Sequence, residues 1–104
     1  MIEMKTIRKI MCCCGSGLGS SLIMEMNLDK VLKDLQHMEV QVEHASIAEC
    51  NEYMSDLFVI GSDLAPMFVN YPRVVIIDNL ISKEELKEKM KKAFMCKKDV
   101  YCIR

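Results

Sequence analysis

Three short, largely apolar runs constrain the fold of this chain more than any other feature of its sequence. They cover residues 7–13, 57–60 and 74–77, and each gives way within two residues to glycine or polar residues. A strand has a continuous apolar run when both faces of its sheet are covered, as in parallel sheets. Residues 40–42 instead alternate between apolar and polar, which predicts a strand near a sheet edge. We therefore predict four strands in a parallel sheet.

Helical signals occupy the segments between these strands. Residues 46–49 and 82–85 both have the Ser-x-x-Glu pattern of a capping box, which predicts a short helix after the first and a longer one after the second. Residues 64–69 form the predicted crossover helix between the third and fourth strands, with Pro66 tolerable in a first turn. From Ser20 onward, apolar residues recur at the spacing of one helix face: Leu22, Ile23, Met26, Val31, Leu32 and Leu35.

This order of strands and helices predicts an α/β fold. Repeated right-handed crossovers give a three-layer sandwich around a four-stranded parallel sheet of order 2-1-3-4, in the Rossmann-like manner. At 104 residues, 51% of them hydrophobic, the chain is expected to form a single domain over residues 1–104. Ligands bind such sheets at the carboxyl ends of the strands, and the segment after the first strand lies on that edge.

That segment joins a thiol to a glycine-rich turn. Its sequence is Cys14-Gly15-Ser16-Gly17-Leu18-Gly19-Ser20-Ser21, and the predicted first helix follows it. Alternating glycines let the backbone approach a ligand closely, so that successive N–H groups and the helix N-terminus point at one anion. The same groups favour the thiolate form of a cysteine at the head of the loop. Cys14 is therefore the candidate nucleophile, with residues 15–21 as the candidate phosphate cradle.

Counting along the loop separates the known phosphate motifs. Its glycines are spaced G-x-G-x-G, whereas a dinucleotide fingerprint needs G-x-G-x-x-G, and a Walker loop needs a lysine where Ser20 stands. The low-molecular-weight tyrosine phosphatase pattern C-x5-R is closer, and the predicted fold is similar to that scaffold. Ser20 occupies the arginine position, however, and no Asp-Pro pair supplies a general acid, since Asp63 precedes Leu64-Ala65-Pro66. A thiol that accepts a phosphoryl group without the equipment for hydrolysis suits a carrier.

Composition excludes several other classes. The 14 basic and 15 acidic residues are mixed along the chain, so no basic footprint of a nucleic-acid binder is present. The N-terminus lacks a signal-peptide pattern, and residues 10–24 are too short and too rich in Gly and Ser to span a bilayer, which predicts a cytoplasmic protein. The six cysteines are expected to be free thiols. CxxC and HxxxH pairs are missing, so neither a metal site nor a cofactor is predicted.

The loop and its surroundings resemble a known family. An apolar strand, C-G-x-G-x-G-S-S and a Met-rich helix are similar to the IIB components of the bacterial phosphoenolpyruvate-dependent sugar phosphotransferase system, in the lactose/ascorbate branch and most of all its ascorbate-type members. The resemblance implies a phosphotransferase. Cys14 would take a phosphoryl group from a phosphohistidine on a IIA protein and pass it to a sugar or sugar acid held by a membrane IIC transporter. The protein would then associate transiently with the inner face of the membrane. The implied cradle is Gly15, Ser16, Gly17, Leu18, Gly19, Ser20 and Ser21.

Several alternatives stay open at this point. A thiol redox or arsenate-reductase-like protein on a phosphatase-like scaffold would use Cys14 with a resolving cysteine. Cys12 and Cys13 stand where ordinary apolar strand residues are expected, and their role is open. We expect His44, near the loop's side of the sheet, to be partly exposed without a catalytic role, and most methionines to fill the core. His37 is expected to offset the dipole of the first helix.

Overall fold

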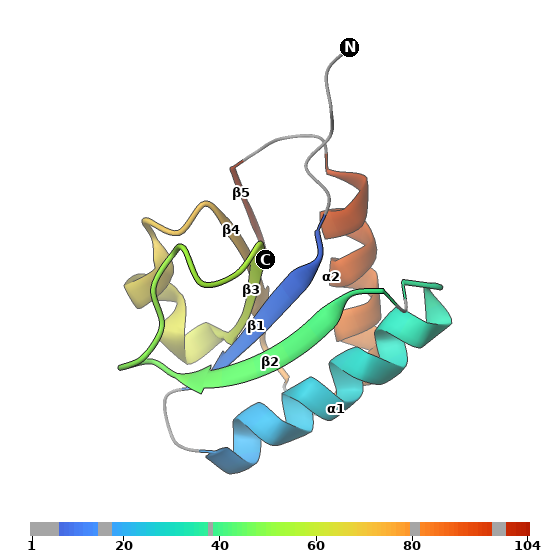
Figure 1. Cartoon of the computed structure of the whole chain (residues 1–104), viewed down its shortest axis with the longest axis horizontal. Coiled ribbons are helices and arrows are strands. Elements are labelled where there is room, and N and C mark those ends of the chain that lie inside the picture. The colour runs from blue at the N-terminus through green and yellow to red at the C-terminus, as the bar shows by residue number, and fades with distance from the viewer. Residues whose placement is uncertain (1–6, 15–17, 38, 80–81, 97–99) are drawn as a thin grey trace.

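A computed structural model describes residues 7–14, 18–37, 39–79, 82–96 and 100–104. Within them, five parallel strands form one sheet of order β2-β1-β3-β4-β5. Helices α1 and α2 lie on one face of this sheet, and the 3-10 helix η1 lies on the other with the segment between β2 and β3 (Figure 1). The elements follow in the order β1 (Lys9–Cys14), α1 (Leu18–Asp34), β2 (Gln41–Ser46), β3 (Leu57–Gly61), η1 (Ser62–Phe68), β4 (Arg73–Ile77), α2 (Lys83–Met95) and β5 (Tyr101–Ile103).

The predicted α/β class, the parallel sheet and the order 2-1-3-4 are confirmed, with β2 at an edge as its alternating pattern predicted. The predicted number of strands is wrong, because β5 adds a fifth. This strand pairs with β4, and the N–H of Tyr101 donates to the carbonyl of Pro72 at 2.7 Å. Three residues are too few for periodicity to identify a strand, so only pairing with β4 defines it.

Two predicted helices differ from those observed. Residues 46–49 form no helix: Ser46 ends β2, and its hydroxyl donates to the Glu49 carboxylate at 2.9 Å within a turn. Asn51 then holds the next turn by accepting the N–H of Tyr53 at 2.9 Å, so turn-forming side chains compete with helix formation here. The crossover between β3 and β4 is the 3-10 helix η1 rather than an α-helix.

Two apolar clusters form the core, one on each face of the sheet. Side chains alternate along β1, so Ile10 and Cys12 face the helices while Met11 and Cys13 face η1. Under α1 and α2, the other fully buried members include Met24, Leu28, Val31, Leu57, Val59, Val75 and Met90. Under η1 they are Phe58, Ile60, Leu64, Phe68, Val74 and Ile76. Strands β1, β3 and β4 are therefore apolar on both faces, as their continuous runs predicted.

Helix α1 ends in a turn that normally uses glycine. Gln36 has φ of 64°, the left-handed region, and the N–H of His37 donates to the carbonyl of Leu32 at 2.8 Å. This is the Schellman arrangement, which satisfies a carbonyl at the helix end. None of the helices in the described part of the chain combines the length and the apolar character that crossing a membrane requires.

Candidate functional site

The carboxyl edge of the sheet places the predicted nucleophile directly before a helix. Strand β1 ends at Cys14, and α1 begins four residues later. The first N–H groups of a helix have no partner within it and form the positive end of its dipole, and this first turn contains no acidic residue. Four predicted cradle residues form that turn, namely Leu18, Gly19, Ser20 and Ser21. The other three lie outside the described residues: Gly15, Ser16 and Gly17. The backbone on either side of them has the strand-to-helix arrangement that anion sites use.

Neighbouring strands end beside β1 and surround this position. Cys14 is the register partner of Ser46 at the end of β2, and Cys13 is the partner of Ile60 in β3. The segments that follow β2, β3 and β4 therefore leave the sheet at the same edge as the loop. Asp63 in η1 and Asp78 after β4 are both exposed there.

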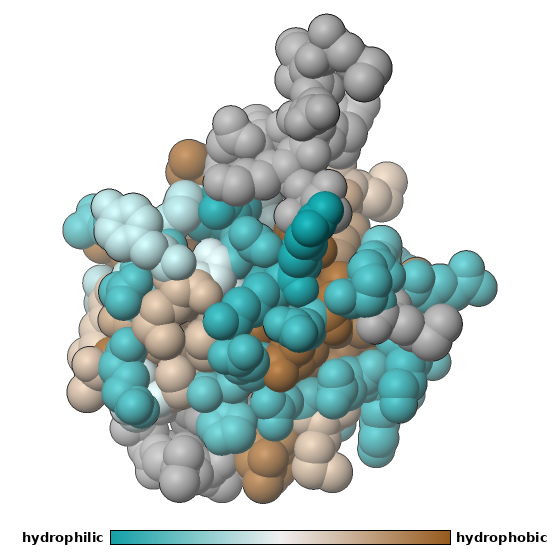
Figure 2. Space-filling model, in the orientation of Figure 1, coloured by the Kyte–Doolittle hydropathy of each residue, from teal (hydrophilic) through white to brown (hydrophobic). Residues whose placement is uncertain are grey.

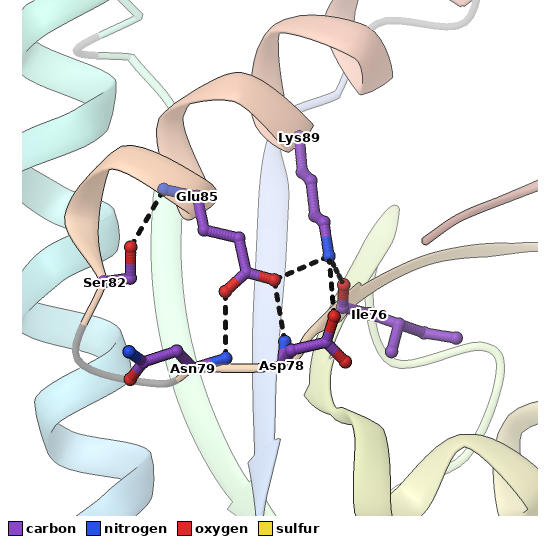
Figure 3. Close-up of polar contacts among 6 residues, drawn as sticks. All are labelled: Ile76, Asp78, Asn79, Ser82, Glu85 and Lys89. Atoms are coloured by element: carbon purple, nitrogen blue, oxygen red, sulfur yellow. Dashed lines mark hydrogen bonds and ion pairs between the residues drawn. The ribbon is translucent and has the colours of Figure 1, made fainter.

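The segment after β4 is held in place by one carboxylate at the start of α2 (Figure 3). Glu85 accepts the backbone N–H groups of Asp78 at 2.8 Å and Asn79 at 2.9 Å. The ammonium of Lys89 donates to the same carboxylate at 2.7 Å and to the carbonyl of Ile76 at 2.7 Å. Burial raises the pKa of Glu85, but these hydrogen bonds outweigh it and the net pKa is lowered. The carboxylate is therefore ionised and fixes the end of β4 against α2.

This network modifies the predicted capping box. Ser82 is the N-cap of α2, and its hydroxyl accepts the N–H of Glu85 at 3.2 Å, as predicted. The Glu85 carboxylate reaches the preceding segment instead of the Ser82 N–H (Figure 3). The i,i+4 spacing of Glu85 and Lys89 was the available sequence signal for their pair. The hydrogen bonds from the N–H groups of residues 78 and 79 to Glu85 depend on the fold, and no sequence pattern indicates them.

Apolar side chains are exposed on α1 close to the candidate site. Leu22, Ile23 and Met26 have 47%, 45% and 53% of their surface exposed, and their spacing puts them on one side of the helix. Figure 2 shows hydrophobic surface over the N-terminal half of α1. Met24 is buried in the core, whereas Met67 in η1 is exposed, so the methionines divide between core and surface. Three exposed apolar residues within five positions mark a patch that a partner protein can cover.

Two cysteines are joined, which corrects the expectation that all six are free thiols. Cys13, at the penultimate position of β1, forms a disulfide with Cys50 in the segment between β2 and β3. Sequence alone could not indicate this pair, because the two residues are 37 positions apart and approach each other only through the sheet. The expected free thiols of Cys13 and Cys50 are thus replaced by a cross-link beside Cys14.

The remaining described cysteines are poorly placed to resolve an oxidised Cys14. Cys12 is fully buried, and burial raises its pKa far above the ordinary value, with the carboxylates of Glu25 and Asp29 raising it further. Cys102 lies in β5, three strands from β1 and thus roughly 14 Å across the sheet. Cys96 is the C-cap of α2, at the end of that helix far from the carboxyl edge of the sheet. While Cys13 and Cys50 are joined, the redox alternative therefore has no suitably placed resolving thiol among the described residues.

The histidines have structural partners. His44 on β2 is partly exposed, as expected, and its Nδ1 lies 3.2 Å from the Glu25 carboxylate of α1. His37, beyond the end of α1, stacks on Phe94 of α2 with ring centroids 3.9 Å apart. Within the described part of the chain, no group of three His, Cys, Asp or Glu residues is arranged to hold a metal ion.

Comparisons with known proteins agree with this geometry. The sequence pattern of the family described as "PTS system, Lactose/Cellobiose specific IIB subunit" matches residues 9–92, which include β1, the loop and every element through most of α2. The ascorbate-specific PTS system EIIB component of Mycoplasma pneumoniae is 25% identical over 87 residues, covering 80% of this chain and 90% of that protein. The IIB family supports a phosphoryl carrier role in sugar uptake. The chain therefore belongs to the lactose/cellobiose IIB family of the phosphotransferase system, in agreement with the family its loop resembles.

Proposed function

We propose that this protein carries a phosphoryl group on the sulfur of Cys14. The observation that carries the proposal is the position of Cys14 at the carboxyl end of β1, followed by the glycine-rich turn and the first turn of α1. Ser20 stands where a phosphatase of this loop type has an arginine. The site supports acceptance of a phosphoryl group and lacks the guanidinium that assists hydrolysis.

Each transfer exchanges one bond to phosphorus. In the first, the Cys14 thiolate attacks the phosphohistidine of a IIA protein, so that an S–P bond forms as the N–P bond breaks and the imidazole leaves. In the second, a hydroxyl oxygen of the carbohydrate attacks the phosphocysteine, so that an O–P bond forms as the S–P bond breaks; the thiolate is restored and the hydroxyl proton passes to a base on the sugar-binding partner or to water. Backbone N–H groups of residues 15–21 offset the charge on the equatorial oxygens in both steps.

Both steps need a partner that covers the site and excludes water. We assign the patch of Leu22, Ile23 and Met26 to contact with the IIA protein, because it lies on α1 within two turns of the loop. A membrane IIC protein holds the sugar or sugar acid, so the carrier works in the cytoplasm and meets the membrane only through IIC. The name of the M. pneumoniae relative favours a sugar acid of the ascorbate type as the substrate.

The test is phosphorylation in a reconstituted system. The protein is incubated with phosphoenolpyruvate, the general phosphotransferase proteins and a cognate IIA, and its intact mass is measured. We expect one phosphoryl group on the natural protein and on Cys102→Ala, and none on Cys14→Ala. Circular dichroism checks that both variants are folded. An undiminished adduct on Cys14→Ala would refute the assignment.

A further inference from the structure

The Cys13–Cys50 disulfide lies immediately beside the proposed phosphoryl acceptor. Cys13 precedes Cys14 in β1 and is fully buried in the cluster under η1. Cys50 is half-buried in residues 47–56, the β2–β3 segment. This segment leaves the sheet after Ser46, the register partner of Cys14. The bond therefore ties the start of the β2–β3 segment to the strand that carries the nucleophile.

The β2–β3 segment is attached to the sheet differently at its two ends. Near β3, Ser55 donates its hydroxyl to the carbonyl of Lys9 at 2.6 Å, and the N–H of Asp56 donates to the same carbonyl at 3.1 Å. These contacts are at the amino end of β1. Near the carboxyl end of β1, the hydrogen bonds that residues 47–54 make with other described residues stay within the segment and the adjoining Ser46. There the disulfide and apolar packing attach it to the sheet.

The fold does not depend on this bond. The cluster under η1 contains seven other buried side chains, and Ile47 and Met54 of the β2–β3 segment also pack against it. A core of this kind keeps a chain folded without a covalent staple. Cys50 is partly exposed whereas Cys13 is fully buried, so a reagent in solution approaches the bond from the Cys50 side. The same sheet can therefore form whether Cys13 and Cys50 are joined as a disulfide or present as two free thiols.

We propose that Cys13 and Cys50 are a reversible thiol pair whose disulfide strengthens the docking of the phosphoryl donor at Cys14. The proposal rests on the proposed function. The oxidant is a low-molecular-weight disulfide such as oxidised glutathione. The Cys50 thiolate attacks it, forming a mixed disulfide and releasing one small thiol. The Cys13 thiolate then attacks the Cys50 sulfur and releases the second, so two protein thiols are oxidised while one small disulfide is reduced.

The disulfide is expected to strengthen donor binding because it orders the start of the β2–β3 segment before the partner binds. A partner that covers Cys14 also meets the first residues of the β2–β3 segment, since Ser46 is adjacent to it. In the joined state these residues are already held against β1. In the reduced state the partner must order them, which weakens binding without altering the chemistry at the sulfur. Ordering one or two side chains corresponds to an increase in KM for the phosphorylated donor of about tenfold, with kcat unchanged.

The first measurement does not depend on phosphoryl transfer. The full chain is equilibrated in glutathione buffers of different ratio, free thiols are alkylated, and the Cys13–Cys50 cross-link is quantified by peptide mapping. Chymotrypsin cleavage after Tyr53, which is 87% exposed, reports the mobility of the β2–β3 segment. We expect a cross-link that forms and disappears with the ratio, and cleavage at least severalfold faster in the reduced protein.

The second measurement compares KM and kcat for the phosphorylated IIA donor between the two states. Cys50→Ser should have the KM of the reduced protein in every buffer, while Cys102→Ser should keep the response. Cys50→Ser in the oxidising buffer also reports any direct oxidation of Cys14. A cross-link that never forms overturns the proposal, as does an equal KM in both states. If Cys14 accepts no phosphoryl group in either state, the proposed function is wrong. The cross-link and cleavage measurements do not depend on phosphoryl transfer, so they distinguish this outcome from a failure of the thiol pair to form.

Discussion

Glu85 is expected to stabilise the carboxyl edge of the sheet through one carboxylate, and Glu85→Ala tests this. The substitution removes the acceptor of two backbone hydrogen bonds, from Asp78 and Asn79, and of one from the ammonium of Lys89. Residues 78 and 79 are exposed, so water can replace the lost acceptor at about 0.5 to 1 kcal/mol for each bond. Lys89 has only 12% of its side chain exposed, and its charge-assisted bond contributes about 1.5 kcal/mol.

The expected loss in unfolding free energy is therefore about 2.5 to 3.5 kcal/mol at neutral pH. It is measured by urea unfolding followed by circular dichroism. Glu88→Ala is the matched control, because Glu88 is an exposed glutamate on the same helix and its replacement should change stability by less than about 0.5 kcal/mol. Glu85→Gln, which keeps one acceptor oxygen, should be intermediate.

The pH dependence gives a second, independent check. The pKa of Glu85 is lower in the folded protein than in the unfolded chain, so its contribution is fully present above the unfolded value of about 4.3 and is lost as pH falls through the folded value. The difference between natural protein and Glu85→Ala should therefore persist at neutral pH and shrink as the pH falls below the unfolded value of about 4.3. A Glu85→Ala cost equal to that of Glu88→Ala, or one that does not change with pH, would refute the reasoning.

Four further predictions concern other parts of the molecule. Met26→Glu should raise KM for the IIA donor by about fivefold without loss of stability, whereas Met95→Glu, exposed at the far end of α2, should not; equal effects would contradict the proposed docking patch. Asp56→Ala should lower the unfolding free energy by about 1 to 2 kcal/mol, because the Asp56 carboxylate accepts two backbone N–H groups at the start of β1; a change within the error of urea unfolding would contradict this. Cys12, buried and with a raised pKa, should react with a thiol reagent at about pH 8 only after unfolding, which peptide mapping of the labelled chain detects. Gln36→Gly should raise the midpoint of thermal unfolding, because glycine adopts the positive φ of this turn without steric cost; an unchanged or lower midpoint would refute it.

Local patterns were sufficient where the structure depends on neighbours in the sequence. The apolar runs of β3 and β4, the alternation in β2 and the Ser82 cap each depend on residues a few positions apart. The helix predicted at residues 46–49 shows the limit of this approach. The segment has the Ser-x-x-Glu pattern of a capping box, but the Ser46 hydroxyl contacts the Glu49 carboxylate within a turn. Asn51 and the apolar packing of the segment favour this turn over a helix.

By itself, the sequence determined the α/β class, the parallel order of the first four strands, and a thiol placed before a glycine-rich turn that lacks an arginine. Burial on both faces and glycine spacing are local properties, so a single chain displays them. Only the tertiary structure decided the fifth strand, the contacts of Glu85 with the segment after β4, and the bond between Cys13 and Cys50. These contacts join residues that are distant along the chain or lack a local pattern. They form because parallel strands bring their carboxyl ends, and the segments that follow them, to one edge of the sheet.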